Sequence, residues 1–254
     1  MTFTSATESV ASPATSAGRC SGCSTRESCL GGLNAAGICG FSDSSGRDVE
    51  RGQHLFRAGE AIRCVFVLRS GAVKTYVTAA SGDEQILGFY SPGDVIGYDS
   101  LSASKQSRNA VALVPSEVCR IPLESLVQNC TRSADLLNRL LAGMGQEIQR
   151  LQGMLKMERL TAEQRIALFL LNQARRQGRT EGSDGGYVLQ LAMTRGEIGR
   201  FLDLATETVS RTLTRLKDAG LIQIDRGSIR LLKPTALQRI VQSQPVNSVE
   251  RIAA

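Results

Sequence analysis

The sequence predicts an α+β protein with an antiparallel, jelly-roll-like β-roll as a sensor domain, a long dimerisation helix and a C-terminal winged helix-turn-helix. Three observations support this order. Short apolar runs broken by turn residues come first, a stripe of apolar residues at helical spacing follows, and two short helices with a hairpin come last. With 254 residues, 42% of them hydrophobic, the chain is long enough for two modest domains or one large one.

Residues 46–130 are predicted to form the roll. An apolar run at 65–68 is followed by a turn at 69–71 and by a second run at 72–77, as expected of short antiparallel strands. Further turns recur at the regular spacing that is typical of a barrel or roll. They lie at residues 80–83, 91–94 and 114–117.

A stripe of apolar residues at steps of four and three predicts a dimerisation helix over residues 131–160. A helix of about 30 residues is roughly 45 Å long, and a small roll cannot cover such a stripe alone. A parallel helix from a second copy is the simplest cover. The alternative is a core helix on its own domain, but the stripe is narrower than such helices usually show. The predicted seam consists of Leu137, Leu141, Met144, Ile148, Leu151 and Leu155.

Residues 161–240 are predicted to form the winged helix-turn-helix. A helix over 162–176 leads into a linker at 177–186 that is rich in glycine and charge. A capping box follows at Thr194-Arg195-Gly196-Glu197, where the Thr194 hydroxyl can bond the Glu197 amide and the Glu197 side chain can return to the amide of the cap. The helix that starts there has one apolar face, formed by Ile198, Phe201 and Leu202.

The second helix of this pair is predicted to present a polar outer face. Its start signal is Thr206, after a turn at 203–205, and its apolar side is formed by Val209, Leu213 and Leu216. The residues left on the outer face are Glu207, Thr208, Ser210, Arg211, Thr214 and Arg215. Because arginine binds guanine through two hydrogen bonds, Arg211 is the best candidate for base specificity. Contacts to the DNA backbone are expected from Thr194, Arg195, Thr206, Thr208 and Arg215.

A hairpin after this helix predicts the wing. Gly220 ends the helix, and the apolar runs at 221–224 and 228–232 flank the turn Asp225-Arg226-Gly227, which places basic side chains at the tip. The alternative is an ordinary helical pair whose charges are only solvated. The two caps, the wing and an excess of 30 Lys and Arg over 24 Asp and Glu together favour a protein that binds double-stranded DNA.

Composition makes an enzyme the less expected class. His54 is the only histidine, which removes the usual general base and most catalytic triads. A redox enzyme or electron carrier is a further alternative, but no Gly-x-Gly-x-x-Gly follows a strand. No stretch approaches the roughly 20 apolar residues of a membrane span, so no membrane partner is expected. Residues 1–18 lack the features of an export signal and, like 241–254, are expected to be a tail, so a cytoplasmic protein is expected.

Seven cysteines in a chain without an export signal predict metal ligation or plain burial rather than disulfides. Cys20, Cys23 and Cys29 crowd three thiols into the segment 19–45, whose glycines let the backbone wrap an iron-sulfur cluster or a zinc ion. One ligand position then remains. The spacing alone does not choose among Cys39, Cys64, Cys119 and Cys130, although Cys64 and Cys130 are better explained as small buried hydrophobes.

Several motifs together carry a family resemblance. They are the spacing of Cys20, Cys23 and Cys29 and the segments Gly82-Asp83-Glu84-Gln85-Ile86, Val118-Cys119-Arg120-Ile121-Pro122, Met193-Thr194-Arg195-Gly196-Glu197-Ile198-Gly199 and Glu207-Thr208-Val209-Ser210-Arg211. With these motifs, the chain resembles the FNR branch of the CRP/FNR regulators from Cys20 to about Leu232.

The resemblance implies a 4Fe-4S cluster on Cys20, Cys23, Cys29 and Cys119. It also implies that oxygen converts this cluster to a smaller one and that the conversion weakens the dimer. It also implies that Glu207, Ser210 and Arg211 read a TTGAT-type half-site twice in a palindrome, as in a transcription activator of anaerobic or microaerobic genes. In such regulators exposed loops of the roll touch RNA polymerase, and residues 82–88 are the matching region.

Two points separate this chain from related regulators. Oxygen-responsive relatives carry an aspartate in the dimer seam where this chain has Leu151, so Leu151 should favour the dimer. Glu158, at the next seam position, is the alternative source of charge repulsion between the two helices. The resemblance also leaves a cyclic-nucleotide receptor as an alternative. Arg108 would serve the phosphate, but Tyr98 follows Gly97 where the ribose carboxylate is expected.

Overall fold

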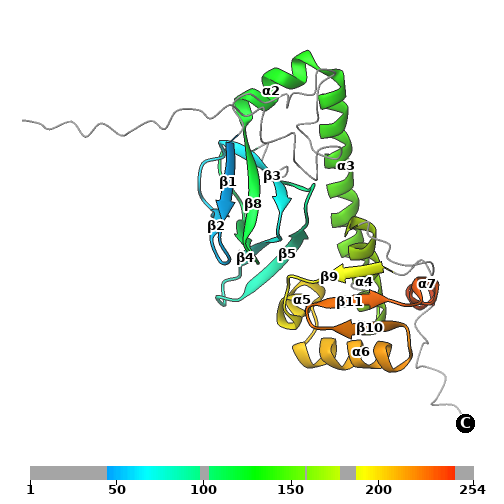
Figure 1. The fold of residues 1–254 in the computed structure, drawn as a ribbon. Helices are drawn as coiled ribbons and strands as arrows, with labels where there is room; N and C mark the ends of the chain where they lie inside the picture. Colours follow the sequence, from blue (N-terminus) through cyan, green and yellow to red (C-terminus); the bar gives the residue numbers. More distant parts are fainter. Residues whose placement is uncertain (1–44, 98–102, 158, 178–186, 244–254) are drawn as a thin grey trace, which may run out of the picture.

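The computed structural model describes residues 45–97, 103–157, 159–177 and 187–243. Figure 1 shows a β-roll, a long helix running beside it and a small head that carries its own sheet. These parts follow one another in the predicted order and confirm the α+β class with a C-terminal winged helix-turn-helix. Within the described ranges, no helix is long and apolar enough to cross a membrane.

Two antiparallel four-stranded sheets form the roll, with strand orders β1-β8-β3-β6 and β2-β7-β4-β5. The core between them is apolar, and the rings of Phe56 and Phe66 stack there at 5.9 Å. The predicted turns at 80–83 and 91–94 each contain a glycine with positive φ, Gly82 and Gly93, as tight connections require. The strands are β1 Ser45–Val49, β2 His54–Phe56, β3 Cys64–Ser70, β4 Val73–Thr78, β5 Glu84–Tyr90, β6 Val95–Ile96, β7 Asn109–Ala112 and β8 Ser116–Pro122.

The helical segment after the roll is divided in two. Helix α2 (Leu123–Arg132) ends at Ser133, whose extended backbone breaks the helix, and α3 (Ala134–Met157) follows. The prediction of one helix from residue 131 was therefore wrong at its start. The physical reason lies in packing and capping: Leu126 docks α2 on the outer face of the roll, and the Ser133 hydroxyl accepts a hydrogen bond from the Leu136 amide at 3.3 Å.

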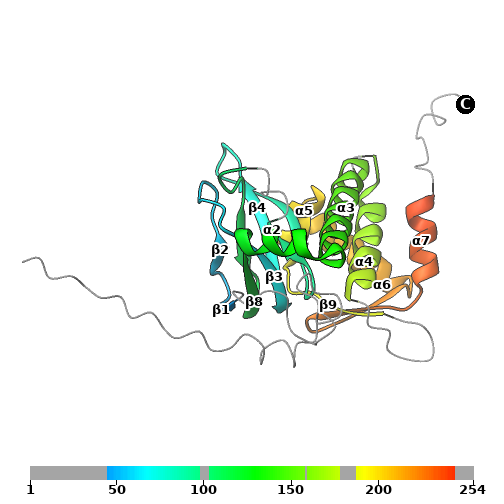
Figure 2. The same ribbon diagram turned by 90° about the horizontal axis from the view of Figure 1, so that it is seen from above.

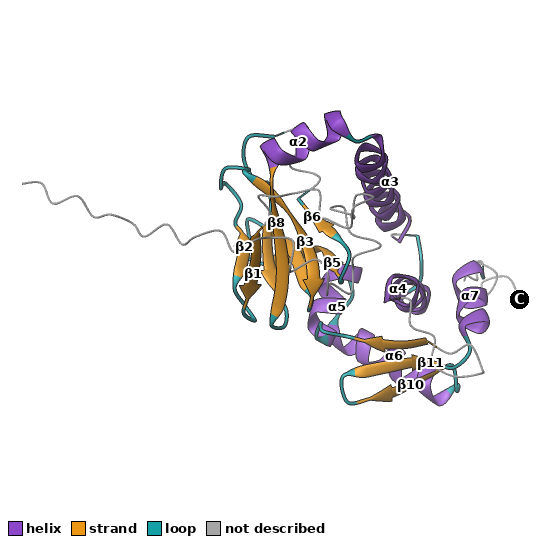
Figure 3. Ribbon diagram, turned by 45° about the horizontal axis from the view of Figure 1, so that its top comes forward, coloured by secondary structure: helices purple, strands orange, loops and turns teal. Residues whose placement is uncertain are grey.

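The head combines a helix-turn-helix with a three-stranded sheet of order β10-β11-β9 (Figure 3). The strand β9 and the helix α7 were not predicted from the sequence. β9 is only four residues long, too short for a clear period, and it becomes a strand because it pairs with β11. The elements are α4 Ala162–Gln177, β9 Tyr187–Gln190, α5 Arg195–Leu202, α6 Thr206–Asp218, β10 Ile222–Asp225, β11 Ser228–Leu231 and α7 Pro234–Gln242.

The roll and the head share one apolar core. Phe89 of β5 lies 5.2 Å from the ring of Phe201 in α5 and 6.3 Å from the ring of Phe169 in α4. Buried residues of both parts belong to this cluster. Figure 2 shows α5 beside the roll, where it packs against β5. The head is therefore seated against the β4–β5 hairpin rather than tethered by a linker alone.

Candidate DNA-reading surface and sensor site

Helix α5 begins with the predicted capping box. The Glu197 amide donates to the Thr194 hydroxyl at 3.2 Å, and the Thr194 amide donates to the Glu197 carboxylate at 2.8 Å. Burial alone would raise the pKa of Glu197, but these bonds and the ammonium of Lys74 outweigh burial and hold the pKa below its ordinary value. The carboxylate is therefore charged at neutral pH.

A tight turn joins α5 to α6. A Cβ added to Gly199 would lie 2.5 Å from the carbonyl oxygen of Leu204, so only glycine permits this approach. Asp203 adopts a left-handed conformation with φ of 54°, which reverses the chain after α5. The angle between the two helices thus depends on backbone positions with special requirements.

Thr206 is not the cap of α6. The Val209 amide bonds the Ala205 carbonyl at 3.1 Å, which makes Ala205 the cap and Thr206 the first helical residue, and no side-chain bond caps the helix. The prediction was wrong by one residue. The Thr206 and Thr194 hydroxyls lie 3.6 and 4.0 Å from the point that a Cβ on Gly196 would occupy. Both threonines are exposed, as is Arg195, so three predicted backbone contacts gather where the two helices begin.

The outer face of α6 is open to solvent, as predicted. Val209, Leu213 and Leu216 are buried in the core of the head. Of the six predicted outer residues, Glu207, Arg211, Thr214 and Arg215 are exposed, and Thr208 and Ser210 are half-buried. Arg215 lies 3.6 Å from the carboxylate of Glu163 in α4. Arginine donors beside a glutamate acceptor can pair with base edges and phosphates.

The wing has the predicted hairpin turn. Asp225 pairs with Ser228 across the turn, and Gly227 supplies the positive φ of 81° that a two-residue turn needs. Arg226 at the tip and Arg230 on β11 are exposed. The head therefore presents cationic side chains from the wing as well as from α6.

The seam of α3 faces solvent in the single chain. Its leucine and isoleucine members are 41–72% exposed, and Met144 is half-buried. Leu136, on another side of α3, is buried against the roll. The alternative in which the stripe is the core of its own domain is therefore wrong. Glu158 lies outside the described residues. The exposed members are Leu137, Leu141, Ile148, Leu151 and Leu155.

Cys119 is the one member of the predicted cluster site that the structure describes. Cys20, Cys23 and Cys29 lie outside the described residues, as does Cys39. Cys119 is half-buried on β8 and packs against the apolar cluster that seats α2 and the first turn of α3 on the roll. In the described part of the chain, no group of three or more His, Cys, Asp or Glu is placed to hold a metal.

The remaining described cysteines differ in their surroundings. Cys64 is buried in the interior of the roll and accepts a hydrogen bond from Arg120 at 3.2 Å, in agreement with a structural role. Cys130 lies on α2, half-buried against the same cluster as Cys119, and burial raises the pKa of its thiol. Cys119 differs from Cys130 because it lies on a strand, and from Cys64 because it is not enclosed in the interior of the roll.

Two family models match the chain: a cyclic nucleotide-binding domain over residues 46–133 and a Crp-like helix-turn-helix domain over 164–240. The chain is 36% identical over 222 residues to the transcriptional activator protein Anr of Pseudomonas protegens, covering 86% of this chain and 90% of that protein. The chain belongs to the CRP/FNR family of transcription regulators. The fumarate and nitrate reduction regulatory protein of Escherichia coli K12 is 34% identical to this regulator over 195 residues, covering 76% of this chain and 77% of that protein.

Solved structures agree with this CRP/FNR assignment. FixK2 from Bradyrhizobium japonicum superposes with a TM-score of 0.69 at 26% identity, covering 78% of this chain and 96% of that one. TTHA1359 from Thermus thermophilus, a regulator of the same family, has a TM-score of 0.61 at 19% identity over 79% of this chain and all of that one, and so supports the fold alone. The curated relatives are regulators rather than enzymes, in agreement with the function class that the sequence predicted.

Sequence reasoning missed how this CRP/FNR chain fastens helix α3 to the roll. Arg150 of α3 donates to both oxygens of Glu147 at 2.8 and 2.5 Å and to the Leu87 carbonyl at 2.7 Å. Leu87 is the extra residue of a β-bulge, and a Cβ on Gly88 would lie 2.7 Å from the Arg150 guanidinium. The partners are 63 residues apart in sequence, so no local pattern marks them.

The same region bears on Arg108, the residue named for the cyclic-nucleotide alternative. Arg108 is buried in the roll, and Tyr98 lies outside the described residues. Burial alone would raise the pKa of Glu147, but hydrogen bonds from Arg150, together with the charges of Arg150 and Arg108, hold it below its ordinary value. The charge of Arg108 thus contributes to keeping the half-buried Glu147 carboxylate ionised.

Proposed function

We propose that this protein is an oxygen-responsive transcription regulator that holds a 4Fe-4S cluster on Cys20, Cys23, Cys29 and Cys119. When bound, the cluster supplies an oxygen-reactive group whose loss weakens the dimer. The observation that carries the proposal is the position of Cys119 against the residues that seat α2 and the start of the seam helix. A ligand bond at this sulfur acts directly beside the helix that joins two copies.

The donor set fits such a cluster. Four thiolates are the usual ligands of 4Fe-4S, and Cys119 is half-buried on the outer face of the roll, whereas Cys64 is buried inside it and accepts a hydrogen bond from Arg120. Curated relatives carry names that refer to fumarate and nitrate reduction. Genes of anaerobic or microaerobic metabolism are the corresponding targets, and a regulator of chromosomal genes acts in the cytoplasm.

Each head of the dimer reads one half of a TTGAT-type palindrome. Glu207, Ser210 and Arg211 supply the base contacts, and the exposed residues at the starts of α5 and α6 supply the backbone contacts. The contact with RNA polymerase lies on the β4–β5 turn. Within the matching segment 82–88, Gly82, Asp83 and Gln85 are exposed, while Ile86 and Gly88 are buried, so the tip of the hairpin is the accessible part.

The test compares cysteine variants under anaerobic conditions. The wild-type protein and Cys64→Ser should contain iron and acid-labile sulfide, should be brown, and should bind a TTGAT palindrome until air is admitted. Cys119→Ser should lose the cluster and the specific binding together. Stoichiometric zinc in colourless wild-type protein, or oxygen-independent binding by Cys119→Ser, would overturn the proposal.

A cyclic-nucleotide receptor is the second candidate, favoured by the family model that matches residues 46–133. It predicts that cAMP raises the midpoint of thermal unfolding, because a ligand that binds only the folded state stabilises it. A concentration-dependent shift with cAMP would favour this second function.

A further inference from the structure

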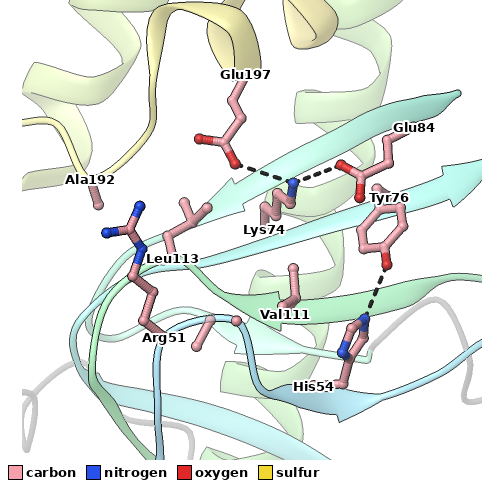
Figure 4. Close-up of a pocket in the computed structure, with 11 residues that line it drawn as sticks. Arg51, His54, Lys74, Tyr76, Glu84, Val111, Leu113, Ala192 and Glu197 are labelled. Carbon is pink, nitrogen blue, oxygen red and sulfur yellow. Dashed lines mark hydrogen bonds and ion pairs between the residues drawn. The ribbon is translucent and has the colours of Figure 1, made fainter.

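One charged side chain of the roll reaches into the reading head. The ammonium of Lys74 on β4 lies 2.7 Å from the carboxylate of Glu84 on β5 and 3.1 Å from that of Glu197 on α5 (Figure 4). The side chains of Lys74 and Glu197 are only 9% and 12% exposed. This contact lies at the wall of a cavity of about 280 Å³ between roll and head. The low exposure of both side chains reduces the screening of their ion pair by water.

The position of Glu197 makes this contact unusual. One carboxylate oxygen closes the capping box with Thr194, and the other faces Lys74. The roll therefore holds the residue that fixes where α5 begins. Arg200, one turn further along α5, lies 3.9 Å from the Glu84 carboxylate, so a second head residue joins the same group of charges.

Arg176 of α4 makes a second directional contact with the roll, since it donates to the Phe89 carbonyl at 2.8 Å and pairs with Asp94. The aromatic contacts between the two parts are less directional. The Phe89, Phe169 and Phe201 rings meet at 5.2–6.3 Å, and such apolar packing permits small rotations. An ion pair with hydrogen-bond geometry is directional, so it restricts the angle of the head on the roll. With the head seated in this way, Glu207 and Arg211 remain exposed. The seated arrangement is therefore compatible with DNA reading.

We propose that Lys74 is a spacing determinant, which pins Glu197 to the roll and thereby holds each reading head at the angle that one half-site spacing requires. The proposal rests on the proposed reading of two half-sites by a dimer. Each added base pair moves a half-site by about 3.4 Å and turns it by about a tenth of a helical turn. A dimer with fixed heads accepts only one such arrangement, whereas loosely held heads populate it only part of the time and bind it more weakly.

The experiment measures binding of the anaerobically isolated, full-length protein to palindromes whose central spacer changes one base pair at a time, and to a single half-site. Wild-type protein should show a sharp optimum. Lys74→Met should bind the optimal spacing about tenfold more weakly, lose little at the other spacings, and bind the single half-site unchanged. Glu197→Gln should do the same, because glutamine preserves the capping box but not the charge.

Glu124→Gln is the matched control, since it removes one exposed carboxylate from α2, away from the head. If the wild type shows a sharp optimum and Glu197→Gln keeps the same profile, the reading of two half-sites stands but the role proposed for Lys74 is overturned. A flattened profile in Glu124→Gln also overturns it, because net charge would then explain the effect. A wild-type profile without any optimum overturns both the reading of two half-sites and the role proposed for Lys74. If Lys74→Met fails to fold, Glu197→Gln decides the outcome.

Discussion

Replacing Leu151 with aspartate should weaken the dimer strongly. Leu151 is 43% exposed in the single chain, and the partner helix is expected to cover that part. Full burial of a leucine side chain contributes about 1.5–3 kcal/mol, so this fraction contributes about 0.6–1.3 kcal/mol per chain and about 1.3–2.6 kcal/mol per dimer. At about 1.4 kcal/mol per factor of ten, the dissociation constant rises roughly tenfold to 70-fold. Two facing carboxylates add repulsion and desolvation, so the dissociation constant should rise by at least this much.

Sedimentation equilibrium of the anaerobically isolated protein over a dilution series measures this change. Gln149→Asp is the control, because residue 149 is exposed on α3 but lies outside the seam, so the same charge should leave the dimer intact. A Leu151→Asp protein that dimerises as tightly as the wild type would refute the assignment of this stripe to the dimer interface. Conversely, cluster-free wild-type protein should retain some dimer at micromolar concentration, since Leu151 adds no repulsion.

The remaining predictions concern the head and the middle of α3. Gly199→Ala should lower the free energy of unfolding by about 1–3 kcal/mol in denaturant titrations, because its Cβ would lie 2.5 Å from the Leu204 carbonyl, whereas Gly145→Ala meets nothing within 4 Å and should not destabilise. Arg211→Ala should leave the iron content unchanged and cost about 1–3 kcal/mol of discrimination at one base pair, measured with operators substituted base by base. The depressed pKa of Glu147 gives stability that is complete above the ordinary carboxyl pKa and is lost as the pH falls through the depressed value, so Glu147→Gln should flatten unfolding stability at acid pH.

Local patterns carried much of the fold. The capping box at Thr194, the wing turn at Gly227 and the apolar side of α6 depend on residues within a few positions of one another, and each is present as predicted. The exposed apolar stripe of α3 was predictable for the same reason, since its period is set by one helix. These features are decided by near neighbours in the chain, which a sequence displays directly.

Features decided by distant partners were not predictable. β9 has four residues and becomes a strand only beside β11, and the break at Ser133 depends on where Leu126 docks on the roll. The predicted cap of α6, Thr206, was one residue too late because the tight turn at Gly199 sets where α6 begins. In each case tertiary packing, rather than intrinsic preference, determined the outcome.

Strand β5 links the two functional parts of the molecule. The Leu87 carbonyl accepts a hydrogen bond from Arg150 of the seam helix, and the Phe89 carbonyl accepts one from Arg176 of α4 at 2.8 Å. These partners are 63 and 87 residues apart in sequence, yet their acceptors are neighbours on one strand. Met157 at the end of α3 also belongs to the core that roll and head share, so α3 approaches the head both directly and through β5. Because packed elements move together, a shift of α3 against the roll is expected to displace the seat of the head.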